Sequence, residues 1–122
     1  MAEPLVLVVE DEFLLRLSAV AMLEDAGSAT LQAGSADRAI EQLEAHAGIR
    51  AVFTDINMPG GMSGAELARL ARLAHPGLRV LMTSGEAVPD PAWLASGIHY
   101  LNKPYDRRSL LAAIDATARA VA

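Results

Sequence analysis

Short apolar runs alternate along the chain with longer segments in which apolar residues recur every three or four positions. The short runs are rich in β-branched residues, and their length is typical of strands buried on both faces of a parallel sheet. The longer segments have the period of helices that pack one face against such a sheet. We predict five strands, over residues 5–9, 29–33, 51–54, 78–83 and 98–102.

The first predicted helix begins at Glu12. Leu14, Leu17 and Ala21 follow at helical spacing, which predicts a helix over this segment. Gly27 is the predicted stop, because glycine readily adopts the left-handed conformation that ends many helices.

Capping residues mark the other helices. Ser35 is expected to cap the second helix, and Ser63 with Glu66 three residues later forms a capping box for the third. Asp106 is the expected cap of the last helix. Between the last two strands the prolines permit only a short fourth helix, which would begin near Pro91.

This alternation of strands and helices predicts an α/β protein with a single doubly wound sheet of five parallel strands and helices on both faces. We expect the flavodoxin-like strand order 2-1-3-4-5 with a shortened fourth helix. The length of 122 residues fits one domain, over residues 1–122. In open sheets of this kind, ligand sites form beyond the carboxyl ends of the strands, where the strand order reverses.

Composition and charge exclude several classes of protein. A net charge of -5 argues against direct nucleic-acid binding, which depends largely on basic side chains. The absence of cysteine excludes a disulfide framework, a thiol nucleophile and thiolate metal ligands. No apolar stretch is long enough to span a bilayer, and the acidic N-terminus is not typical of a signal peptide. We therefore expect a cytoplasmic protein with no membrane partner.

Polar side chains gather at the carboxyl ends of the predicted strands. Glu10 and Asp11 follow the first strand, and Asp55 closes the third. Ser84 follows the fourth strand, and Lys103, the only lysine of the chain, ends the fifth. If the first and third strands are neighbours, three carboxylates share one pocket and raise one another's pKa values unless a cation joins them.

The oxygen-rich pocket predicts both a metal and a reaction. Hard oxygen ligands suit Mg²⁺ (or Mn²⁺), and zinc is disfavoured because no Cys or His falls at these strand ends. A carboxylate beside such an ion can attack phosphorus and form an acyl phosphate, while Lys103 neutralises charge on the phosphoryl oxygens. Asp55 is the best nucleophile candidate, because Glu10 and Asp11 sit together as paired metal ligands would.

In these residues the chain resembles the receiver domain of response regulators in bacterial two-component systems. The resemblance extends over essentially the whole chain in order and spacing. Four stretches carry it: Val-Val-Glu-Asp-Glu at 8–12, Thr-Asp-Ile-Asn-Met-Pro-Gly at 54–60, Thr-Ser-Gly at 83–85, and Lys-Pro at 103–104.

The resemblance implies roles for the acidic residues. Asp55 resembles the phosphoacceptor. Asp11 and Asp55 resemble the side-chain magnesium ligands, with the backbone carbonyl of Asn57 as a third ligand. Glu10 resembles the second acidic position, which often acts through water.

Further roles and partners follow from the same resemblance. Lys103 resembles the lysine that contacts the phosphoryl group, and the Lys103–Pro104 bond resembles one that is cis in the family. Ser84, rather than Thr83, resembles the switch hydroxyl, and Tyr100 resembles the aromatic residue that moves inward with it. The implied partners are a histidine kinase or histidine phosphotransfer protein and a downstream protein target, and a phosphorylation-dependent homodimer is open. Such a chain is not a conventional turnover enzyme.

Two departures from the family pattern leave alternatives open. The loop after Asp55 is one residue longer than usual, and the segment between Ser84 and Lys103 is about three residues shorter. The shorter segment motivates a binding module of the same fold that signals without phosphate. A phosphatase is disfavoured, because Asn57 stands where such enzymes usually place a second Asp. A flavin domain is disfavoured, because acidic residues at 10–12 replace a phosphate-binding loop.

Overall fold

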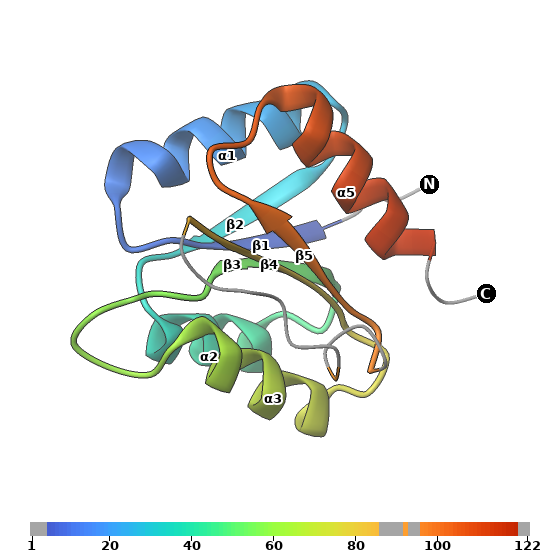
Figure 1. The fold of residues 1–122 in the computed structure, drawn as a ribbon. Coiled ribbons are helices and arrows are strands. Elements are labelled where there is room, and N and C mark those ends of the chain that lie inside the picture. Colours follow the sequence, from blue (N-terminus) through green and yellow to red (C-terminus); the bar gives the residue numbers. More distant parts are fainter. Residues whose placement is uncertain (1–4, 86–91, 93–95, 120–122) are drawn as a thin grey trace.

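The computed structural model describes residues 5–85, 92 and 96–119, which form a five-stranded parallel sheet in the order β2-β1-β3-β4-β5 (Figure 1). The sheet and its order confirm the fold class predicted from the alternating pattern. β3 begins two residues earlier than predicted. The strands are β1 (Leu5–Val9), β2 (Ala29–Ala33), β3 (Ile49–Asp55), β4 (Arg79–Ser84) and β5 (Ile98–Asn102).

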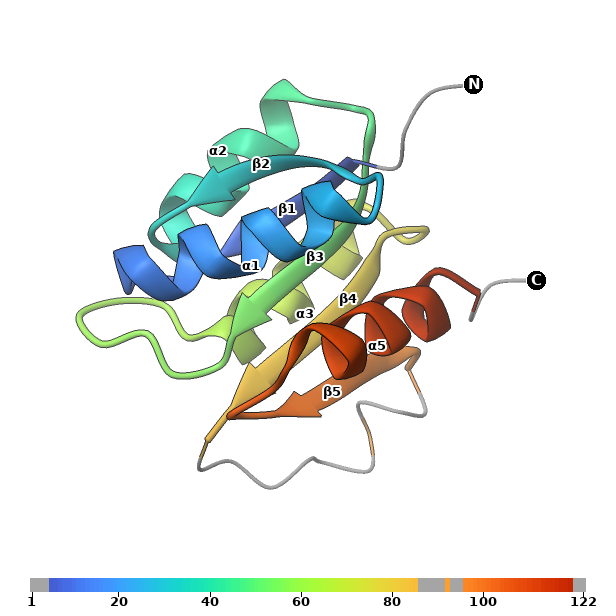
Figure 2. The same cartoon turned by 90° about the horizontal axis from the view of Figure 1, so that it is seen from above.

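Helices cover both faces of the sheet. α1 (Phe13–Asp25) and α5 (Arg107–Arg119) lie on one face, and α2 (Ala36–Ala45) and α3 (Gly64–Ala74) lie on the other (Figures 1 and 2). The short fourth helix predicted near Pro91 lies outside the described residues. In the part of the chain that the structure describes, no helix has the length and apolar character needed to cross a bilayer.

The central strands explain why their apolar runs are continuous. Side chains of a strand point alternately to its two faces. Leu7 and Val9 of β1 belong to the core under α2 and α3, whereas Val6 and Val8 belong to the core under α1 and α5. All four are buried. With both faces covered, a polar residue inside β1 would be removed from water, so the strand shows no polar alternation.

α1 confirms the first predicted helix, but the apolar residues whose spacing indicated it are not the ones it buries. Leu14 and Leu17 are 75% and 38% exposed, and Ala21 is also exposed. The first turns of this helix carry apolar residues on several sides, so the periodicity alone could not choose the face that meets the sheet. The side chains of α1 that are buried are Ala19, Val20 and Leu23.

The predicted helix caps are confirmed. Ser35, Ser63 and Asp106 each accept a hydrogen bond from the backbone N–H three residues later, at 3.2, 3.1 and 2.8 Å. These bonds satisfy donors that the first turn of a helix leaves without a partner. The other half of the capping box differs from the prediction, because the carboxylate of Glu66 pairs with Arg69 at 2.6 Å.

Candidate functional site

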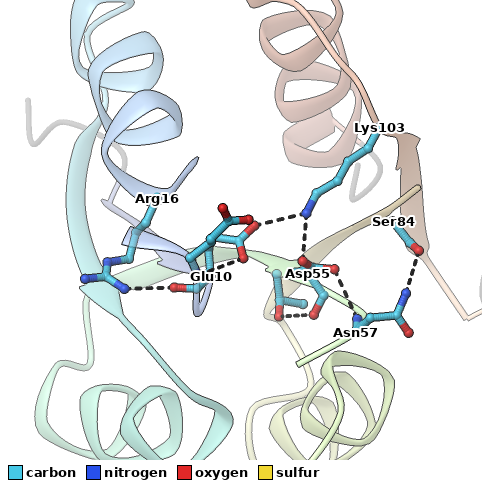
Figure 3. A network of polar contacts seen from close by, with 8 residues as sticks. Glu10, Arg16, Asp55, Asn57, Ser84 and Lys103 are labelled. Carbon is cyan, nitrogen blue, oxygen red and sulfur yellow. Dashed lines mark hydrogen bonds and ion pairs between the residues drawn. The ribbon is translucent and has the colours of Figure 1, made fainter. Parts of the chain in front are cut away.

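The carboxyl ends of four strands bring the predicted site residues to one edge of the sheet (Figure 3). Glu10 follows β1, Asp55 ends β3, Ser84 ends β4 and Lys103 follows β5. Glu10 and Asp55 are each 6% exposed, and Ser84 is 1% exposed. The sheet order makes β1 and β3 neighbours, as well as β4 and β5, so four segments that are distant in sequence meet at the switch point.

The ammonium of Lys103 lies between two of the carboxylates. Its Nζ donates to Asp55 Oδ2 at 2.7 Å and to Glu10 Oε1 at 3.1 Å. Burial lowers the pKa of Lys103, but the hydrogen bonds and charges of Asp55 and Glu10 outweigh this effect and raise it above its usual value. Lys103 therefore stays protonated in this pocket at neutral pH. The Lys103–Pro104 peptide bond is cis.

Glu10 shows that the pocket remains short of positive charge. Burial raises the pKa of Glu10; the backbone N–H of Glu12, 3.2 Å from its Oε2, lowers it. Asp11 and Asp55 raise the pKa further, and Lys103 lowers it. The net shift is upward, so ionised Glu10 is less stable here than in water. A further cation in the pocket would favour the ionised form and lower the pKa of Glu10.

Three carboxylates are arranged so that one ion could contact all of them. One oxygen each of Glu10, Asp11 and Asp55 lies within 4.8 Å of the other two. These donors are all hard oxygens, as Mg²⁺ requires. Two of the carboxylates are buried, and Asp11 is exposed at the rim, which leaves the cluster open to solvent on one side.

Asn57 follows Asp55 in the loop and connects the acceptor candidate to Ser84. The backbone N–H of Asn57 donates to Asp55 Oδ1 at 3.0 Å, and its side-chain Nδ2 donates to Ser84 Oγ at 2.9 Å. These bonds place the main chain of Asn57 beside the carboxylate cluster. The role of its carbonyl as a metal ligand stays a prediction.

Ser84 also joins the pocket to Tyr100 on β5. The phenol hydroxyl of Tyr100 and the backbone N–H of Lys103 both donate to the backbone carbonyl of Ser84, each at 3.0 Å. The hydroxyl of the neighbouring Thr83 is buried without a hydrogen-bond partner among the described residues. Ser84, and not Thr83, therefore lies in the polar network with Asp55. The switch roles of Ser84 and Tyr100 stay predictions.

Two residues at the site were not found from the sequence. Arg16 donates from Nη1 to the backbone carbonyl of Glu10 at 2.8 Å, although it lies within a predicted apolar helix. A single arginine among apolar residues was the one signal that the sequence offered. Gly64, the first residue of α3, packs so closely on Asp55 that a Cβ there would overlap the backbone oxygen of Asp55. No pattern of residues indicates this close approach.

The fold and this pocket define a doubly wound α/β protein with three carboxylates and a lysine at its switch point. The sequence model of the response regulator receiver domain matches residues 6–115, and the chain belongs to this family. As a receiver domain it is a module of two-component signalling.

Solved structures agree with this assignment over nearly the whole chain. The chemotaxis protein CheY4 of Vibrio cholerae is 26% identical with a TM-score of 0.86, and the match covers 95% of this chain and 99% of that one. A CheY-like receiver domain protein of Methanospirillum hungatei is 27% identical with a TM-score of 0.86, covering 96% and 94%. A receiver protein of Sinorhizobium medicae is 30% identical with a TM-score of 0.83, covering 95% and 94%.

Proposed function

We propose that this chain is a cytoplasmic phosphoacceptor, which takes a phosphoryl group onto Asp55 from a histidine kinase or a histidine phosphotransfer protein. The observation that carries the proposal is the Lys103 ammonium, 2.7 Å from Asp55 Oδ2 within a cluster of three carboxylates. A structural ion pair would need one carboxylate, whereas this pocket has more negative charge than Lys103 alone can balance.

The proposed transfer is a displacement at phosphorus. A carboxylate oxygen of Asp55 forms a bond to phosphorus while the N–P bond of the donor phosphohistidine breaks. The electron pair of that bond returns to the imidazole nitrogen, and the product on this chain is an acyl phosphate. Hydrolysis of the acyl phosphate later restores Asp55, so the chain resets its own signal and is not a conventional turnover enzyme.

The carboxylate cluster fits Mg²⁺ (or Mn²⁺) by the chemistry of its donors. Glu10, Asp11 and Asp55 would hold the ion, with the carbonyl of Asn57 as a further oxygen ligand. When bound, the ion supplies positive charge to the phosphoryl oxygens. The same positive charge favours the ionised form of Glu10, whose pKa burial raises.

Lys103 and Ser84 have distinct proposed roles. The Lys103 ammonium, which reaches both Glu10 and Asp55, would contact a phosphoryl oxygen and neutralise charge in the transition state. The Ser84 hydroxyl would donate to another phosphoryl oxygen. Because Tyr100 is hydrogen bonded to the Ser84 carbonyl, a shift of Ser84 would be passed to β5 and change the surface presented to a downstream protein.

Incubation with a small phosphodonor and Mg²⁺, followed by intact-mass measurement, tests the proposal. We expect the wild type to gain one phosphoryl group, and we expect no gain in a chelator or in Asp55→Asn. An unchanged wild-type mass, or an equal gain in Asp55→Asn, would contradict the proposal. An unchanged mass would instead favour the binding module that signals without phosphate.

The docking surface for the phosphodonor protein is proposed to be the start of α1. Four of the five large hydrophobic side chains that are exposed among the described residues lie within its first five positions. The patch begins two residues after Asp11, at the rim of the carboxylate cluster. Exposed apolar patches of this kind mark protein interaction sites. Its residues are Phe13, Leu14, Leu15 and Leu17.

Leu14→Gln is expected to slow phosphoryl transfer from a protein donor about tenfold, the loss expected of a residue that anchors an interface. Leu14 is 75% exposed, so the fold should not change. Uptake from a small phosphodonor should stay at the wild-type rate, because no docking is needed. Leu73→Gln is the matched control, since Leu73 is 69% exposed on α3. Equal losses in both variants, or a loss with the small donor, would exclude this surface.

A further inference from the structure

Arg16 ties the loop that carries the carboxylates to the end of β2, and Figure 3 shows its contact with Glu10. Its Nη1 donates to the backbone carbonyl of Glu10 at 2.8 Å, and its Nε donates to Gln32 Oε1 at 3.1 Å. The guanidinium carbon lies 5.4 Å from the centre of the Phe13 ring. These three contacts restrain the guanidinium, although Arg16 is only half-buried.

Gly34 leaves the space that this arginine occupies. A Cβ at position 34 would lie 3.2 Å from Arg16 Nη1, so the guanidinium would have to shift by a few tenths of an ångström. The residue before Gly34 also contacts this loop, because the backbone N–H of Glu10 donates to the carbonyl of Ala33 at 3.1 Å. The main chain of Glu10 is therefore held at its N–H by the end of β2 and at its carbonyl by Arg16.

The carbonyl of Glu10 belongs to the peptide that leads into Asp11. Because a peptide group is planar, fixing this carbonyl fixes the direction in which the chain enters Asp11. The Glu10 side chain has anchors of its own, in Lys103 and the N–H of Glu12. Asp11 is exposed, so packing does not hold it, and its place in the cluster depends on the main chain.

We propose that Arg16 is a positioning residue for the metal site, which sets the affinity for Mg²⁺ by holding the peptide between Glu10 and Asp11. This inference rests on the proposed function, because it presumes that the cluster binds the ion. The sign of the effect separates it from simple electrostatics. A guanidinium near a cation site repels the cation, so removing its charge alone would raise the Mg²⁺ affinity.

The test is calorimetric titration of the unphosphorylated protein with Mg²⁺, without any phosphodonor. Arg16→Met should weaken Mg²⁺ binding about tenfold, the lower end of losses seen when a group that orients a metal ligand is removed. Arg16→Lys keeps the charge but cannot donate in both directions from a planar fork. Its affinity for Mg²⁺ should therefore fall between the affinities of the wild type and Arg16→Met. Unchanged or tighter binding by Arg16→Met would overturn the inference.

Two further variants keep the outcomes distinct. Arg38→Met removes an arginine from an exposed ion pair with Glu41 on α2, and it should bind Mg²⁺ like the wild type. Asp11→Asn removes a proposed ligand and should abolish binding.

If the wild type binds no Mg²⁺, or Asp11→Asn binds it equally well, the proposed metal site itself fails. If Asp11→Asn loses binding while Arg16→Met does not, only the role of Arg16 fails. Unfolding midpoints in chelator verify that each variant is folded.

Discussion

Replacing Lys103 with methionine is expected to slow phosphoryl uptake about a hundredfold, the loss typical of removing one group that stabilises transition-state charge. The same change should tighten Mg²⁺ binding, because the ammonium occupies Asp55 Oδ2 and Glu10 Oε1 in the resting structure and competes with a cation for both. Uptake is measured as phosphorylated mass against time with a small phosphodonor, and Mg²⁺ affinity by calorimetry. A variant with unchanged uptake would contradict the role proposed for Lys103.

The stability of the same variant should depend on the metal. Lys103→Met leaves the buried carboxylates of Glu10 and Asp55 facing each other without the ammonium. In chelator this should cost about 1–3 kcal/mol of unfolding free energy, less than for a fully buried pair because the lysine side chain keeps some exposure to water. Saturating Mg²⁺ should restore most of the loss. Denaturant unfolding with and without Mg²⁺ measures both values.

Lys103→Arg is the matched control for charge. The chain has nine arginines and a single lysine, so an ammonium at this position is a departure from its own composition. Arginine should keep the pairing with the carboxylates and therefore the stability in chelator. Its planar fork is larger than an ammonium and less able to follow a transient phosphoryl group, so uptake should recover only in part. Full recovery would show that any positive charge serves.

Gly64→Ala should lower the free energy of unfolding by about 3 kcal/mol, at the upper end of the usual cost of overpacking. A Cβ at this position would overlap the backbone oxygen of Asp55 and lie 2.8 Å from its carbonyl carbon and 2.9 Å from Ile56 Cα. All three are backbone atoms, so no side chain can turn away to make room. The N–H of Gly64 also donates to the Ile56 carbonyl at 2.9 Å, which holds α3 against the end of β3.

Thermal unfolding measures this loss, and Gly61→Ala supplies the control. No atom lies within 4 Å of a Cβ at Gly61, and its φ lies outside the left-handed region, so this variant should unfold close to the wild type. Gly64→Ala should also slow phosphoryl uptake, since any shift of α3 moves the backbone of the acceptor residue. Equal midpoints for the two variants would show that α3 can move away without cost.

The fold could be predicted because the sheet is buried on both faces. Covered faces impose apolar runs on the strands, as in Val6 to Val9, and strict alternation with helices then restricts the topology. The rule that sites form at strand ends located Glu10, Asp55 and Lys103 without any contact information. These three residues do converge at one edge of the sheet in the structure.

The features that could not be predicted depend on tertiary geometry. The packing face of α1 depends on how the helix sits on the sheet. Apolar residues lie on several sides of its first turns, so their spacing does not indicate which side is buried. Arg16 contacts the main chain of Glu10, and Gly64 packs on the main chain of Asp55. Contacts to main-chain atoms cannot be predicted from the pattern of side-chain types along the sequence. The bond between Asn57 and Ser84 likewise joins residues 27 positions apart.

Of the three carboxylates, Asp55 is the one proposed to accept the phosphoryl group. Reducing the phosphorylated protein with borohydride converts a phosphorylated aspartate to homoserine, which peptide mapping then locates. We predict homoserine at position 55 alone, in samples that received both phosphodonor and Mg²⁺. Reduction at Asp11 or Glu10, or a phosphorylated protein with Asp55 intact, would contradict the assignment of Asp55 as the acceptor.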